Sequence, residues 1–354
     1  MKLRPLPCFA SALVLLLSNP AVACTMAMVE NTMLAWARDD DALYFDSYDK
    51  LFQLDRWIGG IAALPLGSIP RALTSSFTIS PDGRTLAVAT ASHDASCRGL
   101  EPRLTLADVG SGQTLAAMSR PRGHLVVLGW ASDSKSLVIG FSDRRGSAIK
   151  SAPVQEATRV DRNLQPIESL PPEAFGHLRP DLRMALSFDG WSVLTAHWLK
   201  DPRHARGLVA VDLDRQTVRF SADGRRVGYG LQRSAGESVV VIRDAESLER
   251  IATMPLTGQR VLGLAFHPTR PYVAVASEEI AVEPRSDASP ETRLDLLDYG
   301  ERETLGRASI GGYRASRLEW SHDGDTLAVG GSLDESTGSP RPWLMELEQL
   351  APGS

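Results

Sequence analysis

The stretch that decides the fold reads FTISPDGRTLAVAT, from Phe77 to Thr90. An apolar segment leads into the turn at Asp82-Gly83, and a second apolar segment follows at once. Asp-Gly between two apolar segments supplies the positive φ angles that a tight hairpin requires. The second segment is continuously apolar, which is typical of a strand that is covered on both faces. This stretch therefore predicts a buried antiparallel hairpin.

Similar hairpins recur along the chain, and we call the position of Asp82 the turn anchor. The equivalent anchors are Asp39, Asp133, Asp189, Asp223, Thr269 and Asp323. Their spacing is uneven: it is shortest between Asp189 and Asp223 and longest between Asp133 and Asp189. A strand-rich repeat of about 40–50 residues is the signature of a β-propeller, and the mean spacing of these anchors lies in that range. We therefore expect an all-β fold, a seven-bladed β-propeller with one repeat per blade.

A second periodic feature is an acidic residue at the end of each predicted third strand. Every unit except the third has one: Asp55, Asp108, Asp212, Asp244, Asp298 and, near the end, Glu346. The distance from this acid to the next anchor is nearly constant in four units, but Asp223 follows Asp212 after less than half that distance. This short distance predicts either a strand missing between blades four and five or an irregular blade at that point.

The repeats resemble the WD-repeat-like propellers of bacterial envelopes, the group that includes the Tol-system translocation propeller. Gly123-His124 and Gly176-His177 precede their turns as the Gly-His pair does in WD repeats. The Trp-Asp dipeptide of those repeats is missing, and Ala107-Asp108 and Arg243-Asp244 stand in its place. The resemblance covers roughly residues 25–347. It implies the fold more strongly than a function, because propellers host binding, scaffolding and many chemistries.

The N-terminus has the features of a secretory signal peptide. Lys2 and Arg4 precede the apolar stretch Phe9–Leu17, and Ala21-Val22-Ala23 forms a small-residue cleavage site. We therefore expect a signal peptide at 1–23 and a single propeller domain at 24–354, exported to the periplasm. Lipid attachment at Cys24, directly after the cleavage site, is an open alternative. No later segment has the roughly 20 apolar residues of a transmembrane helix.

The end of the chain predicts how the ring closes. Blade seven has only three predicted strands, so we expect Thr25–Glu30 to pair with Trp343–Leu347 as its fourth. Cys24 and Cys97 would then lie on opposite faces of the ring. A strand of five or six residues spans about 17–20 Å, whereas a disulfide needs Cα atoms within about 7 Å. We therefore expect no bond between these two cysteines.

No catalytic or metal motif is complete. Two S-x-x-K patterns, Ser132–Lys135 and Ser147–Lys150, lack the S-D-N and K-T-G elements that such enzymes need. His197 and His204 lack a third metal ligand, and Asp39–Asp41 matches a hairpin turn better than a calcium loop. Trp36, Trp130 and Trp320 recur at one repeat position and are predicted core residues. We expect no catalytic residue, no metal and no cofactor.

Two functions are compatible with these observations. The favoured one is a non-catalytic exported propeller that acts, as a monomer, as a scaffold binding a protein or peptide in the cell envelope. The alternative is an enzyme resembling propeller lactonases or quinoproteins, with its chemistry in the central cavity. The net charge of −5 argues against nucleic acid as the partner.

The loops between second and third strands vary most in length, and recognition in propellers is generally placed on such loops. They are Ser92–Arg103, Leu199–Arg206, Ser277–Arg293 and Leu333–Arg341. Their polar residues form the predicted partner-binding set: Arg98, Arg103, Arg203, His204, Arg206, Glu279, Arg285 and Glu335. The alternative is length variation on a solvated surface with no binding role.

Overall fold

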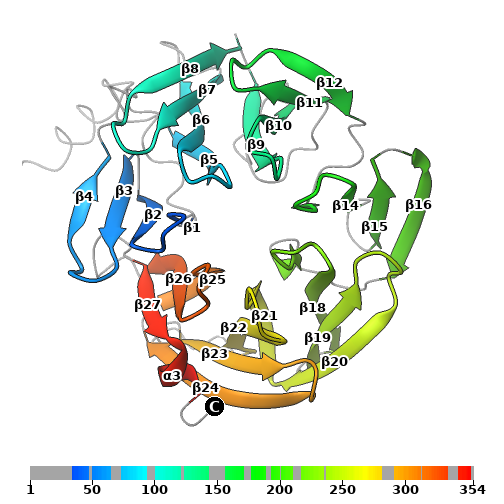
Figure 1. Ribbon diagram of the computed structural model, residues 1–354. Helices are drawn as coiled ribbons and strands as arrows, with labels where there is room; N and C mark the ends of the chain where they lie inside the picture. The colour runs from blue at the N-terminus through cyan, green and yellow to red at the C-terminus, as the bar shows by residue number, and fades with distance from the viewer. Residues whose placement is uncertain are drawn as a thin grey trace, which may run out of the picture.

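The protein is a ring of seven antiparallel sheets, as the computed structural model shows (Figure 1). The structure describes residues 34–47, 50–64, 73–93, 100–120, 123–142, 156–170, 177–188, 193–199, 201–209, 217–234, 237–280, 291–311, 313–333 and 342–351. Within these residues six sheets have four strands and the last has three. The first strand of each blade lies nearest the centre of the ring (Figure 1). The seven-bladed, all-β prediction is confirmed.

The blades follow one another in chain order. Blade one is β1 (Leu34–Trp36), β2 (Ala42–Ser47), β3 (Lys50–Asp55) and β4 (Ile61–Ala63). Blade two is β5 (Leu73–Ile79), β6 (Thr85–His93), β7 (Leu100–Asp108) and β8 (Thr114–Ser119). Blade three is β9 (His124–Trp130), β10 (Ser136–Ser142), β11 (Glu156–Asp161) and β12 (Pro166–Leu170). Blade four is β13 (His177–Leu178), β14 (Met184–Phe188), β15 (Val193–Trp198) and β16 (Asp201–Val209).

The remaining blades complete the ring. Blade five is β17 (Arg219–Phe220), β18 (Arg226–Ser234), β19 (Glu237–Asp244) and β20 (Arg250–Thr257). Blade six is β21 (Gln259–Phe266), β22 (Tyr272–Glu279), β23 (Glu291–Asp298) and β24 (Glu303–Gly311). Blade seven is β25 (Tyr313–Trp320), β26 (Thr326–Leu333) and β27 (Trp343–Glu346), followed by the short helix α3 (Leu347–Leu350).

The turn between first and second strands has one chemistry in six blades. The anchor carboxylate accepts the backbone N–H of the residue two positions later, at 2.9 to 3.4 Å. The residue directly after the anchor has a φ of 57° to 81°, the left-handed conformation that glycine, asparagine and aspartate tolerate best. In blade six the imidazole Nδ1 of His267 replaces the carboxylate and accepts the N–H groups of Thr269 (3.2 Å) and Arg270 (3.0 Å).

The acids that end third strands also accept backbone N–H groups of the turn that follows. Asp55 Oδ1 accepts two such bonds at 2.9 Å, and Asp244 Oδ1 accepts two at 3.0 Å. The third unit was predicted to lack this acid, and that prediction is wrong. Asp161 ends β11 and accepts the N–H groups of Asn163 and Gln165, each at 2.8 Å.

Blade four departs from the predicted register. Its first turn runs from Arg179 to Arg183, and Asp181 Oδ1 accepts the Arg183 N–H at 3.0 Å. Asp181 is therefore the anchor, whereas Asp189 lies between β14 and β15, outside the described residues. With Asp181 as the anchor, the distances to Asp133 and to Asp223 become similar to each other and to the spacings of the other blades.

No strand is missing between blades four and five, because each has four strands. Asp212 follows the fourth strand β16 rather than a third strand, which accounts for its short distance to Asp223. Blade four is irregular in another way: β13 has only two residues, and β15 and β16 are joined by a tight turn between Trp198 and Asp201.

The hydrophobic core lies between neighbouring blades. Trp36, Trp130 and Trp320 end their first strands and are buried, as predicted. Trp36 Nε1 donates to the Glu319 carbonyl at 3.1 Å, and Trp320 Nε1 donates to the Ala265 carbonyl at 3.3 Å. Each of these two tryptophans thus links its blade to the preceding one, and the Trp36 bond crosses from blade one to blade seven.

The last strand, β27, pairs with β26 within the described residues. Its Glu346 caps helix α3, and Leu347 and Leu350 of that helix are buried in the cluster shared with blade six. The predicted closing strand Thr25–Glu30, the signal peptide at 1–23 and both Cys24 and Cys97 lie outside the described residues.

Candidate functional site

The predicted partner-binding residues are only partly described. Arg103 is exposed within the third strand β7, not in a loop, and Glu279 is exposed at the end of the second strand β22. Arg98, Arg285 and Glu335 lie outside the described residues. The structure therefore does not test this set as a binding surface.

The placement of Arg203, His204 and Arg206 on a loop between second and third strands is wrong. All three lie in β16, the fourth strand of blade four. The Arg206 guanidinium donates to the Ser247 carbonyl at 3.0 Å, in the turn between the third and fourth strands of blade five. Arg206 thus links two blades on the side of the hairpin turns. The prediction failed because the wrong anchor, Asp189, shifted the predicted strands of blade four along the chain.

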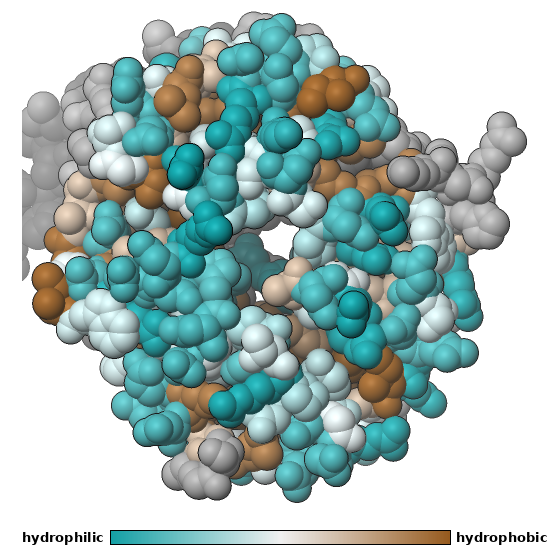
Figure 2. All heavy atoms as spheres, in the orientation of Figure 1, coloured by the Kyte–Doolittle hydropathy of each residue, from teal (hydrophilic) through white to brown (hydrophobic). Residues whose placement is uncertain are grey.

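The face that carries the turns, which we call the turn face, bears an exposed apolar tip in blade one. Trp57 and Ile58 follow the third-strand acid Asp55, and their exposed fractions are 70% and 81%. Ile61 at the start of β4 is 37% exposed, and the other two residues of β4 are also exposed. Hydrophobic side chains appear at the outer edge of blade one among hydrophilic ones (Figure 2, left). We call Trp57, Ile58 and Ile61 the apolar tip.

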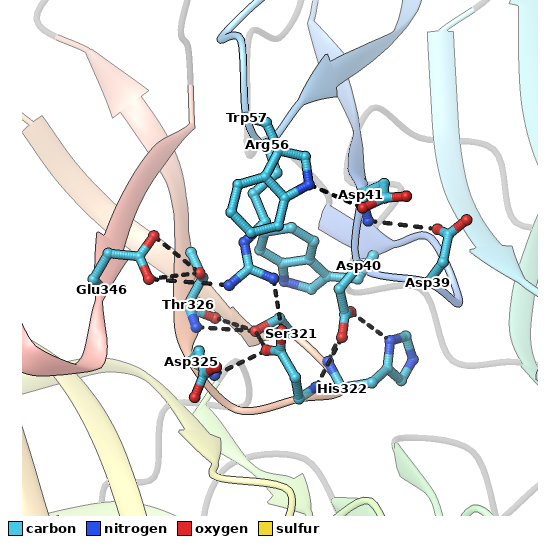
Figure 3. Close-up of polar contacts among 12 residues, drawn as sticks. Asp39, Asp40, Asp41, Arg56, Trp57, Ser321, His322, Asp325, Thr326 and Glu346 are labelled. Atoms are coloured by element: carbon cyan, nitrogen blue, oxygen red, sulfur yellow. Dashed lines mark hydrogen bonds and ion pairs between the residues drawn. The ribbon is translucent and has the colours of Figure 1, made fainter.

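Trp57 is held in one position although it is exposed (Figure 3). Its indole Nε1 donates to Asp41 Oδ1 at 2.9 Å, and its backbone N–H donates to Asp55 Oδ1 at 2.9 Å. The Arg56 guanidinium lies 4.8 Å from the centre of the indole ring. A cation at this distance is attracted to the ring face and restricts its rotation. The tip is therefore pre-organised.

Arg56 also joins blade one to blade seven (Figure 3). Its side chain is 5% exposed, and its Nη1 lies 2.8 Å from Asp323 Oδ2. Burial alone would raise the pKa of Asp323, but hydrogen bonds from Ser321 and Arg56, together with the Arg56 charge, lower this pKa to about 2. An arginine on the turn-anchor aspartate of the preceding blade forms what we call an inter-blade clasp.

A second clasp joins blades two and three. Arg162 Nη2 lies 2.5 Å from Asp82 Oδ2, and the Asp82 N–H donates to Ser134 Oγ at 3.0 Å. Burial would again raise the pKa of Asp82, but bonds from Ser80, Arg162 and Arg84 lower it to about 2. Both arginines directly follow a third-strand acid, so the clasp has a fixed position in the repeat.

A pocket of about 450 Å³ lies beside the apolar tip, between blades one and two. Ala37, Ala42, Tyr44, Gln53 and Val109 supply apolar and neutral lining. Its charged lining residues are Asp39, Asp41, Asp55, Asp82 and a single arginine, Arg38. Burial and the Asp39 charge raise the pKa of the Tyr44 hydroxyl. The pocket is thus acidic and adjoins the tip through Asp41 and Asp55, which hold Trp57.

The ring has an open centre (Figure 2), and a few charged groups of the first strands interact there. Burial and the nearby charge of Arg317 lower the pKa of Arg219 in β17 to about 10. Desolvation by the surrounding strands raises the pKa of Glu319 in β25, although its side chain is solvent-accessible, and the Arg219 charge opposes this shift. Arg219 lies in blade five, whereas Arg317 and Glu319 lie in blade seven, so their charges interact between two blades that are not neighbours in the ring.

Within the described part of the chain, no group of three His, Cys, Asp or Glu side chains is placed to hold a metal ion. In those same residues, no helix combines the length and the apolar character needed to cross a membrane. Asp39–Asp41 forms the ordinary hairpin turn that the register predicted.

The apolar tip and the clasps escaped sequence reasoning. Arg56 and Asp323 are 267 positions apart, and no local pattern relates them. A signal for the tip was present: Trp57 stands directly after a third-strand turn begins, away from the repeat position shared by the three core tryptophans. A large apolar residue outside the core register is a candidate for a contact surface.

No protein-family model and no curated protein matches this chain. Its structure is similar to a chain in the crystal structure of the mitotic checkpoint complex, with 14% identity, a TM-score of 0.59 and coverage of 89% of this chain and 86% of that one. It is also similar to the Cps50 (Swd1) β-propeller domain of Myceliophteria thermophila, with 15% identity, a TM-score of 0.58 and coverage of 90% and 97%. At such identities the likeness shows the propeller fold.

Proposed function

We propose that this chain is an exported, non-catalytic β-propeller that binds a protein or peptide in the cell envelope. The observation that carries the binding role is the exposed Trp57, whose indole is held by Asp41 and Arg56. Tryptophan and arginine are enriched among the residues that contribute most to protein interfaces. An anchor that is already held in place loses little conformational entropy when a partner binds. The export role rests on the signal-peptide pattern at 1–23.

Site-specific photo-crosslinking in envelope extracts tests the binding role. A benzophenone amino acid is placed singly at Ile58 on the turn face, at Glu279 beside a loop of the opposite face, and at Ile167 on the outer strand β12 as a control. We expect one discrete adduct from at least one of the two faces and none from Ile167. Equal, diffuse labelling from all three positions would contradict a specific scaffold. The predicted loop set, with Arg103 and Glu279, stays a prediction that the Glu279 probe examines.

Export is tested separately in a bacterial host that produces the full chain. We expect mass spectrometry of the periplasmic fraction to find an N-terminus at Cys24, with or without a lipid. An intact 1–23 segment on protein that remains inside the cell would refute the export proposal and leave the binding proposal standing.

An enzyme with chemistry in the central cavity is the second candidate, and the charged groups of Arg219, Arg317 and Glu319 favour it. A screen of the purified protein for lactone hydrolysis discriminates the two functions. Our proposal expects no activity above that of the Glu319→Gln variant. Turnover that this substitution abolishes would favour the enzyme.

A further inference from the structure

The apolar tip and the acidic pocket form one continuous surface. Asp41 lines the pocket and accepts the Trp57 indole N–H at 2.9 Å, and Asp55 lines it while accepting the Trp57 backbone N–H. A side chain that entered the pocket would therefore place its neighbour in the sequence on the indole. Exposed apolar surface rimmed by polar residues marks interaction sites in soluble proteins.

The charges of the pocket define what it can accept. Of its four carboxylates, Asp82 is already paired with Arg162, and Arg38 supplies one positive charge. The carboxylates of Asp39, Asp41 and Asp55 accept only N–H donors of their own turns and of Trp57 within the described residues. The pocket keeps an excess of negative charge in a partly enclosed space, where a cation is favoured.

Tyr44 lies beside these carboxylates. It lines the pocket with an exposed fraction of 5%. A phenol hydroxyl can accept a hydrogen bond from an ammonium or guanidinium group.

We propose that this surface binds an extended segment of a partner protein in which a Lys or Arg stands next to an aliphatic or aromatic residue. The basic side chain enters the pocket beside Asp39, Asp41 and Tyr44, and the apolar side chain packs on Trp57 and Ile58. This inference rests on the proposed function and deepens it by naming the chemistry of the partner. A second copy of this chain fits less well, because the chain is acidic overall, with a net charge of −5.

A peptide selection tests this proposal. A library of displayed random 12-residue peptides is selected on the purified mature protein, and the enriched peptides are synthesised and titrated by fluorescence anisotropy. Two variants remove the two halves of the surface: the tip variant Trp57→Ser with Ile58→Ser, and the pocket variant Asp39→Asn with Asp41→Asn. The control variant is Ile167→Ser with Glu168→Ser, which removes one exposed apolar and one exposed acidic side chain from the outer strand β12. Thermal melting confirms that all variants fold.

We expect the enriched peptides to share a basic residue beside an apolar one. Their affinity should fall at least tenfold in the tip and pocket variants and stay within twofold in the control. Binding of the basic peptides should weaken as salt is raised in the wild type, and less so in the pocket variant. An Asn in place of Asp41 can still accept the indole N–H, so the pocket variant tests charge separately from the position of Trp57.

Several results would overturn the proposal. Peptides without a basic residue, wild-type affinity in the tip and pocket variants, or no enrichment at all would each reject it. Sedimentation analysis that finds a dimer lost in the tip variant would assign the surface to a second copy. If the crosslinked envelope partner still binds both variants with wild-type affinity, this inference fails while the proposed function stands.

Discussion

Blades two and three are neighbours in the sequence, whereas blades seven and one lie at opposite ends of the described chain, yet both pairs meet through an inter-blade clasp. Between blades seven and one, the Arg56 side chain is 5% exposed; between blades two and three, the Arg162 side chain is 41% exposed. The two junctions therefore place the same ion pair in different surroundings. A charge that is shielded from water interacts more strongly with its partner and is costlier to leave unpaired.

A second polar contact accompanies each clasp, and this contact too is the more strongly charged at the junction between blades seven and one. At the closing junction the buried Asp40 carboxylate accepts the backbone N–H groups of His322 and Asp323, both at 2.8 Å. At the junction of blades two and three, the neutral Ser134 hydroxyl takes this place and accepts one N–H at 3.0 Å. Hydrogen bonds to ionised groups are about twice as strong as neutral ones. The ends of the ring are thus joined by the more charged and more enclosed version of one repeated contact.

The largest effect is expected from removing the two clasp arginines in turn. Arg56→Ala should lower the free energy of unfolding by about 2 kcal/mol, because it leaves Asp323 and Glu346 without their cation and removes a group packed on two tryptophans. Arg162→Ala should cost only about 0.5 kcal/mol, as for an exposed ion pair. Urea denaturation measures both. Equal losses would show that enclosure does not distinguish the junctions.

A smaller effect is expected when the closing junction is given the chemistry of the other one. Asp40→Ser should cost about 1 kcal/mol, because a neutral hydroxyl replaces a carboxylate that accepts from several donors. Asp40→Asn is the matched control: asparagine tolerates the φ of 59° at this position and keeps one acceptor oxygen. We expect it to lose about half as much. If the Asn variant is as stable as wild type, the negative charge has no role here.

The smallest effect concerns acid. The pKa values of Asp82 and Asp323 are both lowered to about 2, so the stability they contribute is present above the unfolded value of about 3.9 and is lost as pH falls towards 2. Both carboxylates are partly exposed, and solvent screening limits each contribution to about 0.5 kcal/mol. Asp323→Asn and Asp82→Asn should each flatten the dependence of the melting temperature on pH between 4 and 2. A slope as steep as that of wild type in both variants would exclude the clasps as its source.

The sequence predicted the number of blades because six of the seven hairpin turns place a carboxylate and a left-handed residue at fixed positions. It failed in blade four, where Leu182 occupies the left-handed position with a φ of 57° and no glycine marks the turn. Asp189-Gly190 offered the stronger local signal and moved the predicted turn too far along the chain. The error was therefore one of turn chemistry, and it moved Arg203, His204 and Arg206 with it.

The candidate site was less accessible to sequence reasoning than the fold. The acids that hold Trp57 were read correctly as turn residues, but nothing local predicts that Asp41 reaches the indole. The pocket needs two neighbouring blades, and the clasps need residues 80 and 267 positions apart. Loop length pointed to the opposite face because length can be counted along a chain, whereas rigidity and exposure cannot.

The turn of blade six is built on His267 instead of a carboxylate, so its stability depends on pH in a different range from that of the other turns. The imidazole can accept its two N–H bonds only when Nδ1 carries no proton, and burial, followed by the Arg270 charge, lowers its pKa. An unfolded histidine takes up a proton near pH 6.5, so the contribution of this turn is complete above that value and declines below it. The protection factors of the Thr269 and Arg270 amides, corrected for the intrinsic exchange rate at each pH, should therefore fall as the pH drops below about 6.5, while those of the carboxylate turns in the other blades stay constant. At mildly acidic pH, the turn of blade six is therefore the first of the seven hairpin turns to lose stability.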